Sequence, residues 1–508
     1  MRINNHNLTI MKKTILIIMF LVAAATSNSA SAKVGDVNGD GTVTSVDITV
    51  LYNYLLNEDA SSIVNGDQDG DGAITSGDVT VVYNILLNGA SGPDIDDYNV
   101  DIVYDGTSAT VTAASNISDQ LTIVVNGAHV NIVADATLQD SIIYNLSGST
   151  SNGSFYMDGD YKCYVNLTDL TIHNPDSAAI NIDNGKRIDV TLNGISTLTD
   201  ATGGAQKACF FINGHAVIAG EGTLNITGNS KHAYFSDEYT RIASGIITVL
   251  NSVSDGFHIN QYLQIDGGTV TISTTGGDGI DVGMTKTTTD SHNGEFIMNG
   301  GSLAVNTTGD AVKAIKSESI MTIAGGTITA STSGNATYDA TTADLSSCAA
   351  IKCDSTFNMS DGSVYLMSTG MGGKGLNTDG SVNISGGTFT AVTTGDMYEY
   401  SSTLDTKAGG VKADGSITIT GGTVRVAASK DEGRAFKGEL GFFTNGGYIM
   451  GIGGKSSTVS SGYTQKYKYL RNQVITGGMT YTAEGMSFDI PTIYNNSAAN
   501  VTVSTPDM

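Results

Sequence analysis

Hydrophobic and polar residues alternate through most of the chain after about residue 98, in short runs interrupted by paired glycines. Alternation with a period of two predicts β-strands with one buried face. Five runs share one pattern, in which two short strands flank a glycine pair: LQIDGGTVTIS, FIMNGGSLAVN, MTIAGGTITAS, VNISGGTFTAV and ITITGGTVRVA. The pattern predicts a repeated β unit.

The spacing of these glycine pairs predicts how the units are arranged. The pairs end at Gly268, Gly301, Gly326, Gly387 and Gly422, so neighbouring units are about 23 to 25 residues apart, or about 33 to 36 where a loop is inserted. This period is typical of a solenoid, and we expect a right-handed parallel β-helix rather than a β-sandwich. The repeat is lost after residue 455, and we expect residues 455–508 to cap the last coil.

Residues 36–89 have a different, helical periodicity. Two matching apolar sets lie thirty-one residues apart: Ile48, Leu51, Tyr52, Leu55 and Leu56, then Val79, Val82, Tyr83, Leu86 and Leu87. We expect two short helices that are stable only when packed through these stripes.

Each predicted helix follows an acidic twelve-residue loop, DVNGDGTVTSVD at 36–47 or DQDGDGAITSGD at 67–78. A calcium loop supplies oxygens from positions 1, 3, 5, 7 and 12, with glycine at position 6. The expected calcium ligands are Asp36, Asn38, Asp40, Thr42 and Asp47 in the first loop and Asp67, Asp69, Asp71, Ala73 and Asp78 in the second. Without calcium, we expect this unit to be largely unfolded.

This repeated loop and helix resembles a type I dockerin, in which the loops end in Asp where a standard EF-hand has Glu. The resemblance implies a small all-α module with two calcium loops that performs no chemistry and docks onto a cohesin domain of a scaffold or surface protein. It assigns partner choice to the two residues before each closing Asp, here Ser45 and Val46, and Ser76 and Gly77. The two pairs differ, so the choice of cohesin stays open.

A second motif follows many of the glycine pairs: DGFHI, DGIDV, DAVKA, AAIKC, KGLNT, GGVKA and RAFKG. Its third residue is apolar and predicts one buried column: Phe257, Ile280, Val312, Ile351, Leu376, Val411 and Phe436. Its first place reads Asp255, Asp278 and Asp310 on successive coils, after His232. Carboxylates stacked about 4.8 Å apart repel one another. We therefore expect calcium there, with Asp281 adding an oxygen, although Asp-Gly is also ordinary turn chemistry.

The fourth place becomes basic on later coils, at Lys313, Lys352, Lys412 and Lys437. Four lysines on one strip of an acidic protein could bind a carboxylated polymer, or they could simply balance neighbouring acids. The insertions GMTKTTTDSHN, NATYDATTADLSS and DMYEYSSTLDTKA fall in the same neighbourhood and either wall a cleft or decorate it.

Residues 120–455 resemble the carbohydrate-binding β-helix family of cellulosome-bearing bacteria, through these motifs and segments such as SIIYNLSGSTSNGSFYMDG. The resemblance implies a pectate-lyase-like fold, calcium on the coils at Asp255, Asp278 and Asp310, and binding of cellulose or acidic pectin. Later coils depart from the family pattern, since the acid is replaced at Ala349, Lys374, Gly409 and Arg434.

The remaining sequence sets the compartment. Residues 1–32 predict a signal peptide, since Lys12 and Lys13 precede an apolar run and a small-residue cleavage site. No later stretch has the roughly eighteen apolar residues of a membrane span. A net charge of −25 without a basic patch argues against nucleic acid. Of the four cysteines, which we expect to be buried thiols, only Cys348 and Cys353 form a candidate pair.

Together these features predict a dockerin at 33–89, a linker at 90–97 and a β-helix at 98–508. We expect a secreted, noncatalytic, calcium-dependent protein that binds plant cell-wall polysaccharide and docks onto a cohesin scaffold. The alternative is a pectate-type lyase that works by β-elimination, with calcium on the substrate carboxylate and Lys313 as the base. A glycoside hydrolase and a structural fibre fit less well.

Overall fold

The computed structural model describes residues 35–508 except 69–72, 88–97, 139–140, 275 and 431. The predicted signal peptide, the linker and two predicted calcium ligands, Asp69 and Asp71, lie outside the described residues. The chain divides into two compact units, one ending at Asp97 and one running from Tyr98 to Met508. The prediction of a mostly β chain preceded by two helices is confirmed.

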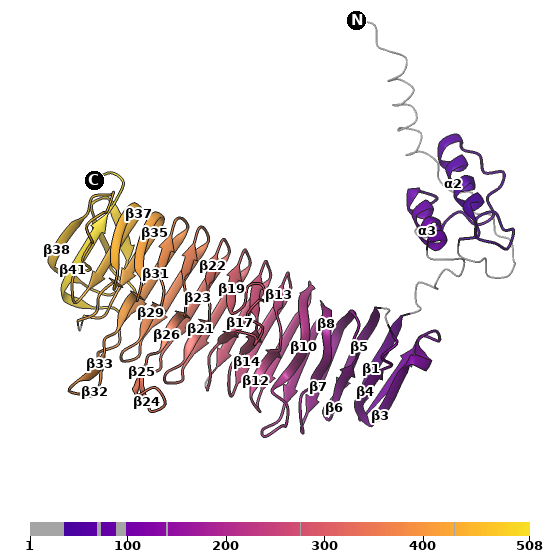
Figure 1. Ribbon diagram of the computed structural model, residues 1–508, viewed down its shortest axis with the longest axis horizontal. Helices are drawn as coiled ribbons and strands as arrows, with labels where there is room; N and C mark the ends of the chain where they lie inside the picture. The colour runs from indigo at the N-terminus through magenta and orange to yellow at the C-terminus, as the bar shows by residue number, and fades with distance from the viewer. Residues whose placement is uncertain (1–34, 69–72, 88–97, 139–140, 275, 431) are drawn as a thin grey trace, which may run out of the picture. The chain divides into compact units, whose positions relative to one another are not determined.

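The N-terminal unit contains α2 (Ser45–Asn57) and α3 (Ser76–Leu87), shown in Figure 1. A capping box starts α2: Thr44 accepts a hydrogen bond from the N–H of Val46, and Asp47 accepts one from the N–H of Thr44. Such reciprocal bonds satisfy helix N–H groups that would otherwise lack partners. The first loop and its helix therefore share Asp47 as a common anchor.

The buried face of the helices differs in part from the predicted stripe. Leu51 and Val82 are buried as expected, but Tyr52, Leu56 and Tyr83 are at least half exposed. The closing aspartates point into their loops and are fully buried, so the residues three and four positions later share their face. The small core of this unit accordingly consists of Val37, Val43, Val50, Leu51, Val79, Val82 and Ile85.

The C-terminal unit is built from three columns of parallel strands (Figure 1). Its first column contains, in order, β4 (Ala128–Ala134), β6 (Gly153–Asp158), the starts of β8 (Ile180–Asn193) and β10 (Ala208–Gly220), β12 (His232–Ser236), β15 (Phe257–Asn260), β18 (Ile280–Gly283), β21 (Lys313–Ser317), β26 (Ala349–Cys353), β29 (Lys374–Thr378), β34 (Gly409–Ala413) and β36 (Phe436–Gly438).

The second column continues from β1 (Asn99–Gly106), β5 (Ile142–Thr150), β7 (Cys163–Asn174), and the later parts of β8 and β10 to β13 (Thr240–Ile242), β16 (Tyr262–Ile265), β19 (Glu295–Met298), β22 (Met321–Ile323), β27 (Phe357–Met359), β30 (Val382–Ile384), and the starts of β35 (Ser416–Ala427) and β37 (Gly441–Gly453).

The third column contains the end of β7, β9 (Ile195–Asp200), β11 (Thr223–Gly228), β14 (Ile246–Ser252), β17 (Thr269–Thr274), β20 (Ser302–Thr307), β23 (Thr327–Thr332), β28 (Ser363–Ser368), β31 (Thr388–Thr393), and the ends of β35 and β37. We call one strand from each column, with its turns, a coil. One continuous hydrophobic core extends from Val100 to Val459.

The paired glycines lie where successive coils come close together. Gly301 has φ near +77°, and a Cβ atom there would be 2.7 Å from the backbone carbon of Gly267 on the preceding coil. Only glycine combines this left-handed backbone with so close an approach. The glycine repeat therefore reflects coil-to-coil contact as well as turn geometry.

Antiparallel strands lie at both ends of this unit. At the N-terminal end, β1 pairs with β2 (Ser108–Ala113), and β3 (Leu121–Asn126) pairs with β4. At the other end, β41 (Asn496–Ser504) pairs with both β37 and β38 (Lys468–Ile475), while β39 (Thr480–Ala483) pairs with β40 (Met486–Asp489). β41 covers the edge of β37 at Ile449–Gly453, as expected for part of a cap on the last coil.

Two short hairpins and the cysteines complete the unit. The hairpins are β24 (Thr337–Asp339) with β25 (Asp344–Ser346), and β32 (Tyr398–Ser401) with β33 (Leu404–Thr406). All four cysteines are buried and unbridged, including Cys348 and Cys353. Within the part of the chain that the structure describes, no helix has the length and apolar character needed to cross a membrane.

Candidate functional site

The strand register corrects one position of the predicted buried column. Phe257 pairs with Ile280, and Ile280 pairs with Ile315 rather than with Val312. The segment AVKAIKS contains two overlapping frames, and KAIK matches the later coils better than DAVK does. On this coil the first place is therefore occupied by Lys313, and the basic fourth place by Lys316.

The predicted carboxylates are joined from coil to coil by backbone hydrogen bonds. Oδ1 of Asp255 accepts from the N–H of Asp278 at 2.8 Å, and Oδ1 of Asp278 accepts from the N–H of Lys313 at 2.7 Å. Asp310 lies outside the column, is exposed, and accepts from the N–H of Asn335 at 2.7 Å. Burial raises the pKa of Asp278 to about 7. Asp255 and Asp278 are therefore adjacent as predicted, and Asp310 is not.

Two histidines complete the surroundings of Asp255. Nδ1 of His258 lies 2.9 Å from Oδ2 of Asp255, and Nδ1 of His232 lies 3.1 Å from the same oxygen. Burial would raise the pKa of Asp255, but hydrogen bonds with His232 and His258 hold it well below its usual range. Burial also opposes the charge on His258, yet Asp255 and Asp281 raise its pKa to about 9. Sequence analysis missed His258, whose signal is its fourth place in DGFHI.

The carboxylate of Asp281 also contacts side-chain nitrogen atoms. It lies 3.4 Å from Nδ1 of His258 and 3.0 Å from Nζ of Lys316. Burial would raise the pKa of Asp281, but His258 and Lys316 lower it. Calcium requires about six to eight oxygen ligands. The predicted set of Asp255, Asp278, Asp281 and Asp310 does not fit calcium, because nitrogen groups take up its oxygens and one member lies out of register.

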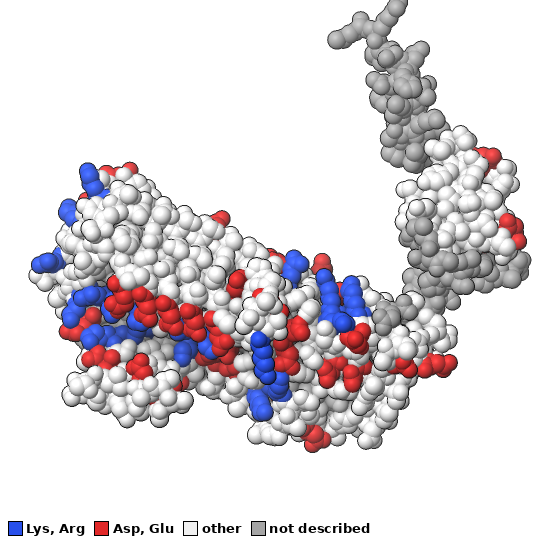
Figure 2. Space-filling view, viewed as in Figure 1, with Lys and Arg blue, Asp and Glu red and all other residues white. Residues whose placement is uncertain are grey.

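The basic strip consists of Lys316, Lys352, Lys412 and Lys437, which share one register position. Lys352, Lys412 and Lys437 lie where they were predicted, and Lys316 replaces Lys313. Each lysine pairs with an acid two residues later, as in Lys352 with Asp354 at 2.7 Å. A row of acids consequently runs beside the row of lysines (Figure 2). Exposed pairs of this kind contribute little energy each.

A basic cleft of about 410 Å³ lies where the strip approaches the C-terminal cap. Its charged lining consists of Lys374, Lys407, Lys412, Arg434, Lys437 and Lys455, with Asp405 and Glu432. Lys407 lies 2.7 Å from Asp405, and Lys455 lies 2.8 Å from Glu432. Arg434 is exposed and has no ion pair among the described residues. The cleft therefore has an excess of positive charge in an otherwise acidic molecule.

Lys374 anchors one wall of this cleft. Its Nζ is buried and donates to the carbonyl oxygens of Gly372 and Lys407 at 2.6 and 2.7 Å, and to Oγ1 of Thr406 at 2.8 Å. Burial, followed by the charges of Lys412, Lys437 and Lys407, lowers the pKa of Lys374 to about 7. The hydrogen bonds to Thr406 and Lys407 hold the base of the β32–β33 hairpin against the coil.

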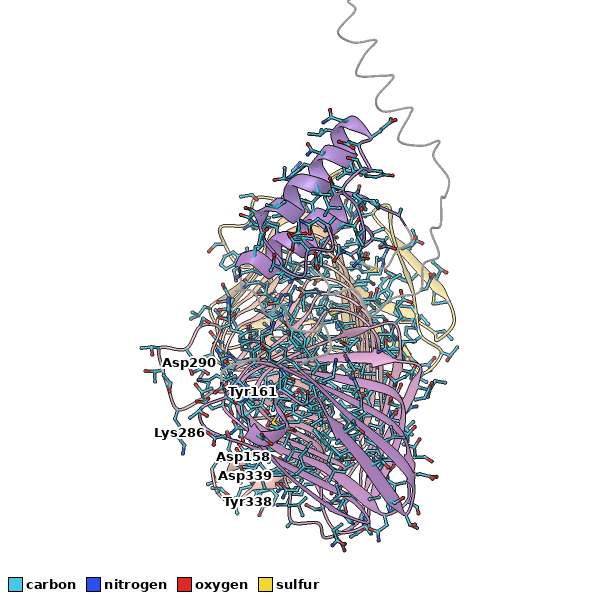
Figure 3. The ribbon with its side chains drawn as sticks, turned by 90° about the vertical axis from the view of Figure 1, so that its right-hand side faces the viewer. Asp158, Tyr161, Lys286, Asp290, Tyr338 and Asp339 are labelled. Atoms are coloured by element: carbon cyan, nitrogen blue, oxygen red, sulfur yellow. The ribbon has the colours of Figure 1, made fainter. Side chains whose placement is uncertain are left out.

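The two hairpins support each other beside the cleft. The rings of Tyr338 and Tyr400 stack with centroids 4.2 Å apart, and Oγ of Ser347 lies 3.3 Å from Oγ1 of Thr406. Figure 3 shows the β24–β25 hairpin, at Tyr338 and Asp339, projecting to the same side as the loop that carries Lys286 and Asp290. Because β33 contributes Asp405 and Thr406 to the lining, the third insertion forms part of the cleft wall.

The first acidic loop of the N-terminal unit folds around its own carboxylates. Asp36 accepts from the N–H groups of Asp40 and Gly41, and Asp47 accepts from those of Val37 and Thr44. The second loop repeats the closing arrangement, because Asp78 accepts from the N–H groups of Gln68 and Thr75. Both closing aspartates are fully buried.

The charge of this unit fits a bound cation. Residues 34–97 contain twelve acidic residues and no Lys, Arg or His. Burial of a carboxylate without a counter-charge is costly, and residues 34–97 contain no basic side chain to supply one. The described ligands of the first loop, Asp36, Asn38, Asp40, Thr42 and Asp47, therefore fit calcium, as do Asp67, Ala73 and Asp78 at their loop positions.

Comparison with known proteins places these features in a family. The model of a family described as carbohydrate-binding domain-containing protein matches residues 126–397, more than half of the chain. The chain belongs to this family. A type I dockerin model matches residues 2–56 and 34–64. The prediction of an N-terminal dockerin followed by a carbohydrate-binding domain is thus confirmed.

Among solved structures, the polysaccharide lyase-like protein from C. thermocellum, studied as a gadolinium derivative, is 23% identical with a TM-score of 0.41. The alignment covers 51% of this chain and 96% of that chain. No curated protein matches the chain.

The residues predicted to choose the dockerin's partner lie at the starts of α2 and α3, where Ser45, Val46 and Ser76 are exposed and Gly77 is half-buried.

Proposed function

We propose that this chain is a secreted, noncatalytic protein that holds an acidic plant cell-wall polysaccharide in the basic cleft. Its dockerin attaches it to a cohesin-bearing scaffold, and the three strand columns of the carbohydrate-binding domain form a right-handed parallel β-helix. The positive charge of the cleft is the observation that supports an acidic glycan as the ligand, because membership of the family does not specify which sugar is bound.

The cleft supports a carboxylated ligand through Arg434. This arginine has no competing carboxylate among the described residues, whereas Lys407 and Lys455 are already paired. A guanidinium binds a carboxylate with two parallel hydrogen bonds, which gives direction as well as charge. The volume of about 410 Å³ is within the range of small-ligand sites, which is enough for part of a polymer to enter.

Calcium acts in the dockerin. Asp36, Asn38, Asp40, Thr42 and Asp47 would hold one ion, and the second loop would hold another through Asp67, Asp69, Asp71, Ala73 and Asp78. The ions would neutralise the loop carboxylates and so fix the loops from which α2 and α3 start. The helix starts at Ser45, Val46, Ser76 and Gly77 would then face the cohesin.

The hydrogen bonds made by Lys313 and Lys374 support a binding function rather than catalysis of β-elimination. Elimination needs a base with a free lone pair beside the substrate. Nζ of Lys313 donates to the carbonyl of Ala311 at 2.7 Å and lies 3.0 Å from Oγ of Ser346. Nζ of Lys374 is buried and donates to the carbonyl oxygens of Gly372 and Lys407 and to Oγ1 of Thr406. These hydrogen bonds favour a structural role over a catalytic one for both lysines.

The test compares Arg434→Gln with a matched exposed arginine outside the cleft, Arg471→Gln, in the intact chain with calcium present. We expect Arg434→Gln to weaken binding of short oligogalacturonates at least about tenfold, or ~1.4 kcal/mol, as measured by calorimetry. Arg471→Gln and a neutral glucan serve as controls. Equal affinity of the two variants would contradict the cleft, and a steady rise in ultraviolet absorbance from unsaturated products would contradict the noncatalytic role.

A further inference from the structure

Three side chains from two neighbouring coils converge on one point of the first strand column. His232 begins β12, Asp255 lies just before β15, and His258 lies within β15. We call them the His–Asp–His cluster. One ligand atom from each residue, a ring nitrogen from each histidine and a carboxylate oxygen from Asp255, lies within 4.8 Å of the other two. The side chains are 13% to 24% exposed, so the cluster is sheltered but reachable from solvent.

Two of the three distances within the cluster, those from each histidine to Asp255, match the ligand separations around a small divalent cation. Nδ1 of His232 and Nδ1 of His258 lie 3.1 and 2.9 Å from Oδ2 of Asp255. Nitrogen and oxygen ligands lie about 2.0 to 2.2 Å from a zinc ion. At tetrahedral or octahedral angles, such ligands are roughly 3 Å or slightly more from one another. A cation could therefore enter with little movement of the side chains.

The surroundings hold these ligands in place. The ring of Phe235 stacks on His258 with centroids 4.8 Å apart and an angle of 14°. Oδ1 of Asp255 is fixed by the N–H of Asp278, which leaves Oδ2 directed at the histidines. Nδ1 of His232 lies 3.2 Å from the backbone nitrogen of Asp255 and 3.1 Å from its Oδ2, so this ring nitrogen faces Asp255. Such outer contacts orient metal ligands in known sites.

The donor set points away from calcium. Two imidazole nitrogens and one carboxylate suit zinc and similar transition metals, whereas calcium selects oxygens. Three protein ligands also leave a fourth position open, as in sites where a metal binds water or a ligand. The sequence predicted calcium on these coils, but the cluster offers two nitrogen ligands and one oxygen ligand, which suit a different class of metal.

We propose that the His–Asp–His cluster binds one divalent transition metal ion of the zinc class. Nδ1 of His232, Oδ2 of Asp255 and Nδ1 of His258 are the protein ligands, and one position stays open to water or an external ligand. Binding displaces the proton through which His258 bonds to Asp255, as metal binding to imidazole requires. This proposal does not depend on the glycan cleft or on the cohesin.

The experiment titrates the intact chain with zinc in a large excess of calcium, which saturates the dockerin loops. Calorimetry should show one equivalent of saturable binding, and cobalt should give the visible absorption bands of a low-coordinate nitrogen and oxygen site. His258→Gln and His232→Gln should each weaken zinc binding about 100-fold or more, since even outer-shell changes cost about 10- to 100-fold. His292→Gln, which removes a histidine 2.9 Å from Glu295, should have no effect.

Lack of saturable zinc uptake in excess calcium would overturn the proposal, as would equal losses in His258→Gln and His292→Gln. Circular dichroism without metal checks the fold of each variant. If a histidine variant is destabilised, Asp255→Asn decides the question, because its amide oxygen can still accept the N–H of Asp278. Unchanged zinc affinity in that variant would show that the cluster is only a hydrogen-bond network.

Discussion

Asp200, the last residue of β9, shows how burial controls a single charge. Its side chain is nearly inaccessible, and it accepts a hydrogen bond from the N–H of Asn229. Burial raises its pKa from 3.8 to about 6, although that hydrogen bond and His173 oppose the shift. Between these values the folded chain holds a proton that the unfolded chain has lost. Stability therefore falls as the pH rises through this window and stays lower above it.

Asp200→Asn removes this penalty, so we expect it to raise the free energy of unfolding by about 1 to 3 kcal/mol above pH 6 and by nothing near pH 4. Urea unfolding of the intact chain in excess calcium, at pH 4 and pH 8, measures the difference. Asp135→Asn, at an exposed aspartate of the same unit, is the control. A gain of equal size at both pH values would mean that packing, not charge, is responsible.

Single residues also mark the limit of sequence analysis at the candidate site. The neighbourhood of Asp255 and Asp278 follows from the repeat, but Asp310 was placed wrongly because AVKAIKS allows two frames. Ala311, with φ near +60°, turns the chain between Asp310 and β21, and no sequence pattern marks that turn. His258 was missed because a lone histidine has no repeat partner, and only the register places it beside Asp255 and His232.

At the scale of elements, we expect α2 and α3 to depend on charge neutralisation more than on packing. Among the described residues, their shared core contains seven buried apolar residues, while residues 34–97 contain twelve acidic residues and no basic one. We expect a chelator to abolish the helical signal of α2 and α3 and to leave the β signal of residues 98–508 unchanged. Circular dichroism and amide hydrogen exchange of the intact chain separate the two responses.

A matched pair of variants tests the first loop itself. Asp40 lies at its fifth position, whereas Asp59 is an exposed aspartate beyond α2 that accepts from the N–H of Ser61. Asp40→Asn should lower calcium affinity at least about tenfold, because affinity follows ligand charge. Asp59→Asn should leave it unchanged. Similar effects of both variants would show that general charge, rather than ligation, governs the helices.

Elements were predicted unevenly for a physical reason. Strands flanking paired glycines were predictable, because alternation and close coil contact both leave a local pattern. The helix faces were only partly predictable: the apolar stripe placed Tyr52 and Leu56 in the core, but the buried closing Asp47 rotates the face toward Val50 and Leu51. The basic cleft was only partly predictable: the repeat placed Lys412 and Lys437 on one strip, but Lys374, Arg434 and Lys455 join them from other register positions and loops.

At the scale of the whole molecule, the positive cleft is embedded in a negative body. Residues 98–508 contain 38 acidic and 21 basic residues, and the N-terminal unit adds twelve more acids. A polyuronate therefore meets repulsion at long range and attraction only near the cleft. The Debye length is about 30 Å at 0.01 M salt and about 10 Å at 0.1 M, so added salt removes the long-range part first.

We therefore expect the association rate with short oligogalacturonates to rise as salt increases from 10 to 100 mM at fixed calcium, by roughly a few-fold. This sign is opposite to that of a basic protein binding a polyanion, because screening here weakens the long-range repulsion while the short-range contacts at Arg434 and Lys437 persist. Stopped-flow mixing measures the rate, and a neutral glucan should show no trend. A rate that falls steadily with salt would mean that the field of the cleft, and not the net charge of the molecule, governs the approach.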